Sequence, residues 1–280
     1  MNNIEKTLTE KVTSQLIKLT YTLPPDVKKS LHYAYKKERK PLAKFVLKQL
    51  IENYKIAEEK KFPLCQDTGT IIFFVKVGIK SQYKEINFEK VLNTAIKNAY
   101  RAGFLRSSIV KDPLRRENTG DNTPGIIHYE ITTGNKVVIE ILAKGGGAEN
   151  VSTLEILPPS LADEKTIITK VINWIKKNAI KACPPIVVGI GIGGTFDYAP
   201  LLAKKALLRK IGSINKDKLY AELERKILEK INKTGIGPQG VGGKTTALAV
   251  FINSAPVHIT SLPLAININC HSIRRGKVVL

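Results

Sequence analysis

The segment Thr70-Ile71-Ile72-Phe73-Phe74-Val75-Lys76-Val77 decides the fold class. Branched and aromatic side chains favour β-strands, and an almost uninterrupted apolar run predicts a strand that is buried on both faces. The preceding residues, Pro63-Leu64-Cys65-Gln66-Asp67-Thr68-Gly69, are rich in the proline, glycine and polar types that form turns. We therefore expect a polar loop that leads directly into a buried strand.

Helical periodicity flanks this strand on both sides. Apolar residues recur at helical spacing from Ile4 to Leu19, and a second helical run follows Pro41 to about Lys60. A third run extends from Phe88 to Ala99 and is closed by Gly103. Residues 1–60 are accordingly predicted to be mostly helical.

Beyond residue 104 the pattern mixes loops, strands and helices. A long polar loop covers residues 105–125, and alternating runs at 126–132 and 136–143 around Thr133-Gly134-Asn135 predict a β-hairpin. A further helix is expected at 162–182, with Ser160 as its N-terminal cap, and two more at 201–211 and 216–233. Further strands are expected at 186–190, 247–252, 258–260, 264–269 and 277–280.

No Pro/Ser-rich linker or internal repeat divides the sequence. We therefore predict a single mixed α/β (α+β) domain over residues 1–280, with a helical N-terminal part packed on mixed or antiparallel sheets. The sequence has no apolar run of about 18 residues, and its first six residues lack the layout of a signal peptide. These features predict a cytoplasmic protein with no membrane segment.

The chain is strongly basic, with 45 Lys and Arg against 24 Asp and Glu and a formal charge of +21. Such a charge attracts small anionic substrates, an acidic partner subunit or nucleic acid. The basic residues are scattered, and only 6% of residues are aromatic and able to stack on bases. We therefore do not predict nucleic-acid binding, although it stays the alternative from a different functional class, supported by charge alone.

The three cysteines, Cys65, Cys183 and Cys270, lie far apart in separate loops. A local zinc knuckle needs ligand pairs two to four residues apart, so this spacing suits a site assembled from distant segments. Three thiolates on a cubane iron–sulfur cluster would leave one iron without a protein ligand, and an open iron is a Lewis acid. The alternatives are three buried, inert thiols, or a zinc site that adds His271.

Three glycine-rich segments have possible anion-binding roles. Residues 189–194 satisfy G-x-G-x-x-G between a strand and a helix, but no acidic residue ends a second strand about 20 residues later, so dinucleotide binding is disfavoured. Residues 240–246 resemble a P-loop, but its first glycine would fall at position 238, which is proline. The three glycines of 145–147 would let backbone N–H groups approach an anion closely.

Taken together, several motifs resemble the alpha region of class I, iron–sulfur-dependent fumarate hydratases. L-tartrate dehydratase alpha subunits share the same pattern. The motifs that carry the resemblance are Cys65-Gln66-Asp67-Thr68-Gly69, Leu105-Arg106 with Asn118-Thr119-Gly120-Asp121-Asn122, Lys144-Gly145-Gly146-Gly147, Gly191-x-Gly193-Gly194, Gly237 to Thr245, and Cys270-His271-Ser272-x-Arg274-Arg275.

The resemblance implies a [4Fe–4S] cluster held by Cys65, Cys183 and Cys270 on loops at one face, with a fourth iron that binds a dicarboxylate substrate. It also implies that Asp67 is the catalytic acid. By the same resemblance, Gln66, Arg106, the backbone N–H near Gly146 and His258 bind or orient the substrate.

The chain ends ten residues after Cys270, so the family's beta region, which carries a threonine base and further substrate-binding residues, is not within it. The resemblance therefore implies a separate beta subunit, in an α₂β₂ assembly, and a chain that by itself holds a cluster but lacks full activity. The expected reaction is the reversible dehydration of (S)-malate to fumarate, with L(+)-tartrate dehydration as the alternative.

Overall fold

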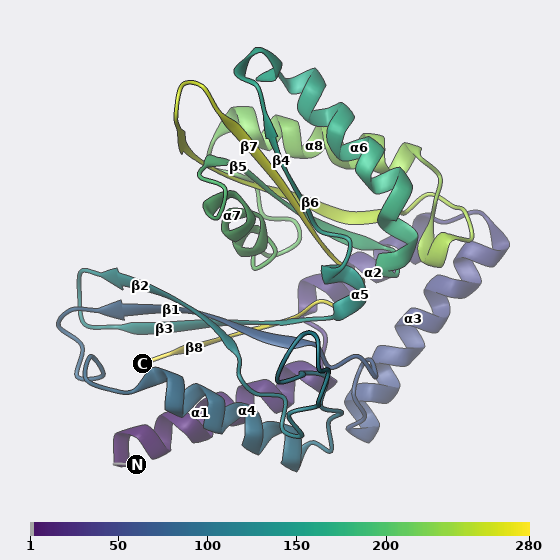
Figure 1. Ribbon diagram of the computed structural model, residues 1–280. Coiled ribbons are helices and arrows are strands. Elements are labelled where there is room, and N and C mark those ends of the chain that lie inside the picture. Colours follow the sequence, from purple (N-terminus) through teal and green to yellow (C-terminus); the bar gives the residue numbers. More distant parts are fainter. Residues whose placement is uncertain (1–2) are drawn as a thin grey trace. The chain divides into compact units, whose positions relative to one another are not determined.

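The computed structural model describes residues 3–280, which form two compact units (Figure 1). The first unit contains residues up to Pro24, Tyr54–Gly146 and Arg274–Leu280, and the second contains Pro25–Asn53 and Gly147–Ile273. The single-domain assignment stays a prediction. Both units combine helices with a four-stranded mixed sheet, which confirms the predicted α/β class with a helical N-terminal part.

The first unit is a sheet of order β2-β1-β3-β8 with two helices, α1 and α4, on one face (Figure 1). Phe73 and Val75 of β1 and Ile139 of β3 project into a core with Leu16 of α1 and Leu92 of α4. The elements are α1 (Asn3–Tyr21), β1 (Thr70–Gly78), α4 (Phe88–Ala102), β2 (Ile126–Thr132), β3 (Val137–Lys144) and β8 (Arg274–Val279).

The predicted hairpin of residues 126–143 is wrong, although both of its strands exist. β2 and β3 do not pair with each other, because β1 lies between them. Ile72 of β1 faces Ile126 in the parallel pairing with β2 and Leu142 in the antiparallel pairing with β3. The physical reason is that β1 is apolar on both faces and buried from Ile71 to Val75, which favours the interior of the sheet over an edge.

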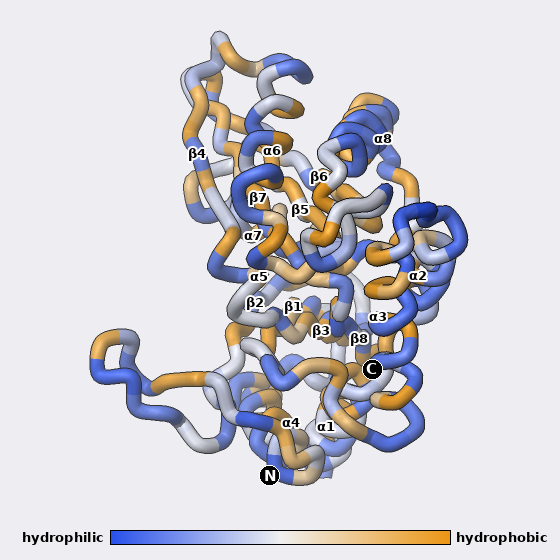
Figure 2. The backbone as a smooth tube through the Cα atoms, turned by 90° about the vertical axis from the view of Figure 1, so that its right-hand side faces the viewer, coloured by the Kyte–Doolittle hydropathy of each residue, from blue (hydrophilic) through white to orange (hydrophobic). Residues whose placement is uncertain are grey.

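The second unit is a sheet of order β4-β7-β5-β6 covered by α6 and α8 on one face and by α7 on the other (Figure 1). Figure 2 shows that β5 and β6 are largely hydrophobic while α8 is mostly hydrophilic. The elements are α2 (Pro25–Lys37), β4 (Thr153–Leu157), α6 (Glu164–Asn178), β5 (Ile186–Gly194), α7 (Tyr198–Ala206), α8 (Lys218–Lys233), β6 (Ala247–Val257) and β7 (Leu262–Asn269). Two helices, α3 (Pro41–Lys60) and α5 (Gly146–Glu149), belong partly to each unit.

The glycines of 189–194 belong to a strand rather than to the expected loop, so the predicted end of this strand at residue 190 is wrong. Gly189 and Gly191 lie on the same face of β5, under α7. A Cβ atom on Gly191 would lie 2.0 Å from the Ala199 carbonyl oxygen, and one on Gly189 would lie 2.2 Å from that of Ala203. These glycines therefore serve the close packing of a helix on a sheet.

Smaller differences concern the ends of elements. The cap of α6 is Asp163 rather than Ser160, because the Asp163 side chain accepts a hydrogen bond from the Thr166 backbone N–H at 2.8 Å. Residues 258–260 form a turn after β6 rather than a separate strand. No helix described within residues 3–280 is long and apolar enough to cross a membrane.

Candidate active site

Asp67 lies in the loop before β1, and the backbone of Gly146 holds its side chain. The Asp67 Oδ2 atom accepts a hydrogen bond from the Gly146 backbone N–H, with 2.7 Å between nitrogen and oxygen. Cys65, a free thiol that is partly buried, stands two residues before Asp67, and Gln66 between them is exposed. This hydrogen bond fixes the orientation of the Asp67 carboxyl group.

Two glycines allow this close approach of the loop to the end of β3. Gly69 has φ +81°, and a Cβ atom there would lie 2.5 Å from the Lys144 carbonyl oxygen. A Cβ atom on Gly145 would lie 3.0 Å from Asp67 Oδ2. Gly145, one of the three glycines expected to let backbone approach an anion closely, thus brings backbone next to the Asp67 carboxylate.

Buried side chains bind the backbone carbonyl groups of the same loop. Arg274 Nη1 donates to the Thr68 carbonyl at 3.1 Å, and the Gly69 carbonyl accepts from Tyr100 Oη at 3.2 Å and from Asn122 Nδ2 at 3.1 Å. The Thr68 hydroxyl donates to the Arg106 carbonyl at 2.6 Å. No role could be predicted for Tyr100 from the sequence, and Asn122 and Arg274 stand in the recognised motifs without a predicted role.

Arg274 brings a positive charge into this anchor. The residue is only 2% exposed, and within residues 3–280 its Nε atom has no hydrogen-bond partner. Burial raises the pKa of the Tyr100 phenol above its usual value, the Asp67 carboxylate also raises that pKa, and the Arg274 guanidinium lowers it. Tyr100 therefore stays neutral and donates its hydrogen bond at physiological pH.

In the second unit, Cys183 ends the short 3₁₀ turn that follows α6 and is exposed. Its backbone has φ +53°, and its carbonyl oxygen lies 3.0 Å from His271 Nδ1. Because a carbonyl only accepts, the Nδ1 atom carries the proton. Gln239 donates to the next carbonyl, that of Pro184, from both its backbone and its side chain at 2.8 Å.

Cys270 follows β7 and is flanked by buried polar groups. Its backbone N–H donates to Asn269 Oδ1 at 3.0 Å. Within the described chain, neither Asn269 Nδ2 nor Ser272 Oγ has a hydrogen-bond partner, although Asn269 is 1% and Ser272 4% exposed. Buried donors without partners are unfavourable, so two beside one thiol indicate a place for an electron-rich group.

His258 and Arg106 are both exposed. His258 lies in the turn between β6 and β7, and its Nδ1 atom lies 2.8 Å from Thr260 Oγ1 and 3.3 Å from the Thr260 backbone nitrogen. The backbone N–H requires Nδ1 to accept, so the neutral ring carries its proton on Nε2. The substrate-binding roles of His258, Arg106, Gln66 and Gly146 stay predictions.

The three cysteines fit a sulfur-ligated group in their chemistry. Within residues 3–280 none of them forms a disulfide, and Cys65 lies in the first unit while the other two lie in the second. Over residues 3–280, no three His, Cys, Asp or Glu side chains are gathered closely enough to hold a metal ion. Thiolates are nevertheless the ligands of iron–sulfur clusters, and the donors of Asn269 and Ser272 suit the sulfur atoms of such a cluster.

The comparisons with known proteins agree with this arrangement of motifs. The model of the family "Fumarate hydratase (Fumerase)" matches residues 9–279. A Methanocaldococcus jannaschii protein named "Putative L(+)-tartrate dehydratase subunit alpha" is 48% identical over 260 residues, which cover 91% of this chain and 90% of that protein. The L(+)-tartrate dehydratase subunit alpha of Escherichia coli strain K12 is 32% identical over 277 residues, covering 98% and 90%.

The family model and these relatives define the class as that of the hydro-lyases, which remove water by breaking a carbon–oxygen bond or add it across a carbon–carbon double bond. The chain belongs to the fumarate hydratase (Fumerase) family. The resemblance found in the sequence is thereby confirmed.

Proposed function

We propose that this chain is the cluster-bearing alpha subunit of a two-subunit cytoplasmic hydro-lyase that interconverts (S)-malate and fumarate. The observation that carries the proposal is the Asp67 carboxylate, fixed at 2.7 Å by the Gly146 N–H and placed two residues from the free thiol of Cys65. An acid held beside a metal-ligating thiol is what the removal of a hydroxyl group requires, because hydroxide is a poor leaving group.

Cys65, Cys183 and Cys270 would hold a [4Fe–4S] cluster. When bound, the cluster supplies an open iron that acts as a Lewis acid toward the substrate hydroxyl. The buried Asn269 Nδ2 and Ser272 Oγ donors beside Cys270 support this ligand set, since they would gain acceptors.

The remaining chemistry falls to the side chains of this chain. Asp67 donates a proton to the departing hydroxyl, and the Gly146 N–H holds Oδ2 so that Oδ1 can carry that proton. Gln66 and Arg106 bind the carboxylates of the substrate, together with His258, whose Nε2–H is a donor. The anchor of Tyr100, Asn122 and Arg274 keeps the Asp67 loop in place.

Dehydration also needs a base that removes the proton from carbon. We assign this base to a beta subunit in an α₂β₂ assembly. The relatives support this assignment because their names describe an alpha subunit. The charge of +21 also favours an acidic partner and an anionic substrate.

L(+)-tartrate is the second candidate substrate, and the names of the relatives favour it. Malate and tartrate differ by one hydroxyl group. A site that hydrogen-bonds that hydroxyl rejects the substrate without it strongly, whereas a site without such a partner discriminates weakly. A direct comparison of the two substrates therefore decides between the candidates.

The cluster is tested by purifying the chain under anaerobic conditions. We expect brown protein with about four irons per chain. Colourless protein with a single zinc would contradict the assignment. DNA retention that depends on salt and survives removal of the cluster would instead support the nucleic-acid alternative.

The catalytic role is tested by co-expression with a candidate beta chain and anaerobic assay on malate and tartrate. Asp67→Asn should keep the cluster absorbance and abolish dehydration. Asp112→Asn is the matched control, because Asp112 is also a loop carboxylate that accepts from backbone N–H groups, those of Leu114 and Arg115. Turnover retained by Asp67→Asn would remove Asp67 from the mechanism.

A further inference from the structure

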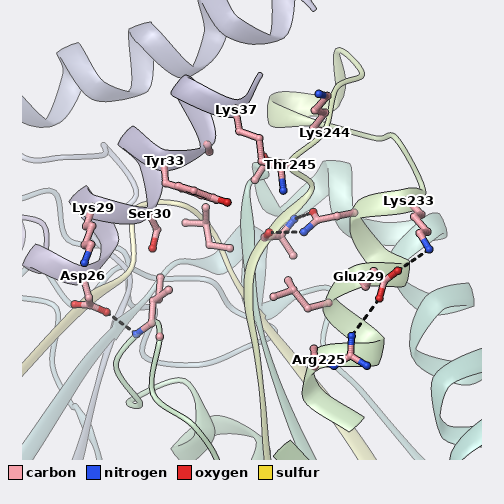
Figure 3. Close-up of a pocket in the computed structure, with 17 residues that line it drawn as sticks. Asp26, Lys29, Ser30, Tyr33, Lys37, Arg225, Glu229, Lys233, Lys244 and Thr245 are labelled. Atoms are coloured by element: carbon pink, nitrogen blue, oxygen red, sulfur yellow. Dashed lines mark hydrogen bonds and ion pairs between the residues drawn. The ribbon is translucent and has the colours of Figure 1, made fainter. Parts of the chain in front are cut away.

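The second unit contains a cavity of about 870 Å³ that the hydro-lyase assignment does not use (Figure 3). One face of α2 and one face of α8 form its sides, and residues 244–248, which lead into β6, form its floor. A volume of several hundred cubic ångströms is typical of sites for small organic ligands. Every lining residue belongs to the second unit.

The walls of the cavity are fixed by hydrogen bonds at both ends of α2. At its start, the Asp26 carboxylate accepts from the Ile211 N–H at 2.7 Å. Just beyond its end, the buried Glu38 carboxylate accepts from the Lys244 N–H at 2.7 Å. On the floor, Asn232 Oδ1 accepts from the N–H groups of Thr246 at 2.8 Å and Ala247 at 2.9 Å. The cavity is therefore preformed.

Among the charged side chains of the lining, the cationic ones are in excess. Five of them, Lys29, Lys37, Arg225, Lys233 and Lys244, face only two carboxylates, Asp26 and Glu229. Glu229 is shared by Lys233 at 2.6 Å and Arg225 at 3.5 Å. Among residues 3–280, no carboxylate lies within ion-pair distance of Lys29 or Lys37. Because Asp26 is the one carboxylate that α2 contributes to the lining, the α2 side of the cavity keeps a net positive charge.

An aromatic ring stands beside these cations. Tyr33 is 65% exposed, and in Figure 3 it reaches with Lys37 from α2 toward the middle of the cavity. The Lys37 Nζ atom lies 5.7 Å from the centre of the Tyr33 ring. Leu228 of α8 and Leu248 of the floor add apolar surface to the lining. A ligand with both a planar ring and anionic oxygens would satisfy the two features together.

We propose that this cavity binds a nucleoside phosphate, with its base against Tyr33 and its phosphates on Lys29 and Lys37. The glycine loop before Lys244 does not cradle the phosphates in this arrangement; the α2 side chains bind them. The proposal concerns a site distinct from Asp67 and the cysteines and does not depend on the hydro-lyase function.

The test is calorimetric titration of the full chain with ATP, adenosine and inorganic tripolyphosphate at about 150 mM salt, where attraction between distant surface charges is screened. ATP should bind more tightly than either fragment. Tyr33→Ala should weaken ATP binding and leave tripolyphosphate binding unchanged. The double variant Lys29→Gln/Lys37→Gln should weaken ATP binding by about tenfold or more, as expected for the loss of two charge-assisted contacts.

The matched control is Lys176→Gln/Lys177→Gln, which removes the same charge from exposed positions on α6 outside the cavity. Its ATP affinity should stay close to that of the unmodified chain. Equal losses in the two double variants would overturn the proposal, because they would show non-specific attraction. Absence of saturable ATP binding, or tripolyphosphate binding as tight as that of ATP and insensitive to Tyr33→Ala, would also overturn it.

Discussion

Asp67 and Gly146 meet because the strands that follow and precede them are antiparallel. Asp67 lies before the first residue of β1, Gly146 lies after the last residue of β3, and Thr70 pairs with Lys144 at that end of the sheet. The loop that enters one strand and the loop that leaves the other are therefore neighbours. The 2.7 Å hydrogen bond between Gly146 N–H and Asp67 Oδ2 is a direct result of this pairing.

Replacing Gly145 with alanine should disturb the Asp67 carboxylate. The new Cβ atom would lie 3.0 Å from Asp67 Oδ2, closer than ordinary van der Waals contact, so the carboxylate must move. Gly134→Ala is the control, because its Cβ atom would meet nothing within 4 Å and Gly134 precedes β3 whereas Gly145 follows it. We expect kcat with the beta subunit present to fall at least about tenfold for Gly145→Ala and to change little for Gly134→Ala. Equal effects of the two variants would contradict this account.

Arg274→Lys should loosen the loop that carries Cys65. Lysine keeps the charge but cannot reproduce the planar guanidinium that donates to the Thr68 carbonyl from a buried position. We expect the free energy of unfolding of the cluster-free chain to fall by about 1–3 kcal/mol, because a buried acceptor loses its partner. Cys65 should also react faster with a thiol reagent.

The control for this prediction is Arg101→Lys, since Arg101 is exposed at the end of α4. It should leave both the unfolding free energy and the thiol reactivity unchanged. Unchanged reactivity of Cys65 in Arg274→Lys would show that Arg274 does not position the loop.

The local elements could be predicted from the sequence because each has its own signal. The apolar run of β1, the helical spacing from Ile4 to Leu19 and the amphipathic α8 all lie where the pattern places them. The order of strands was not predictable in the same way. The turn around Gly134 favours pairing of β2 with β3, but a strand buried on both faces gains more by taking the place between them.

In the candidate site, too, local motifs could be predicted from the sequence and tertiary contacts could not. The residues that carry chemistry, such as Cys65 and Asp67, stand in distinctive motifs that sequence reasoning can recognise. Tyr100 gave no such signal, because its apolar neighbours on α4 assign it to the core and its hydrogen bond to the Gly69 carbonyl depends on tertiary structure. Likewise, nothing in the sequence alone distinguishes a glycine that binds phosphate from one, such as Gly191, that lets a helix pack closely.

Gly191→Ala should destabilise the second unit strongly. A Cβ atom there would lie 2.0 Å from the Ala199 carbonyl oxygen, so α7 must shift away from β5. We expect a loss of roughly 3 kcal/mol in the free energy of unfolding, the upper end of the usual range for overpacking, because the clash is with backbone. Gly134→Ala controls for the substitution itself, because its surroundings are open although its φ is +106°. It should cost about 1 kcal/mol from backbone strain alone. Similar urea midpoints for the two variants would refute the packing role.

Glu224→Gln should be more harmful than the same change at Glu222. Glu224 is largely buried, pairs with Arg209 and accepts from the Ile252 N–H at 2.8 Å. Removing its charge leaves the Arg209 guanidinium over the Phe251 ring without its counterion, which should cost about 2–4 kcal/mol. Glu222 pairs with the exposed Arg225, so its replacement should leave the free energy of unfolding nearly unchanged. Denaturant unfolding of the two variants measures the difference.

Glu38 should make the stability of the chain depend on pH in the acid range. Burial alone would raise the pKa of this carboxyl, but the backbone N–H groups of Lys40, Lys244 and Arg39 hold it below its usual value of 4.5. The unfolded chain therefore takes up the proton first as the pH falls. The stability that Glu38 contributes is fully present above pH 4.5 and is lost as the pH falls through the lowered pKa of the folded state.

At pH 7, Glu38→Gln should lower the free energy of unfolding by about 1–3 kcal/mol, and this difference should shrink on acidification. Glu52→Gln, at an exposed position on α3, should follow the unmodified chain at every pH. A gap between Glu38→Gln and the unmodified chain that stays constant down the acid range would show that packing, rather than the charge of Glu38, holds residues 38 and 244 together.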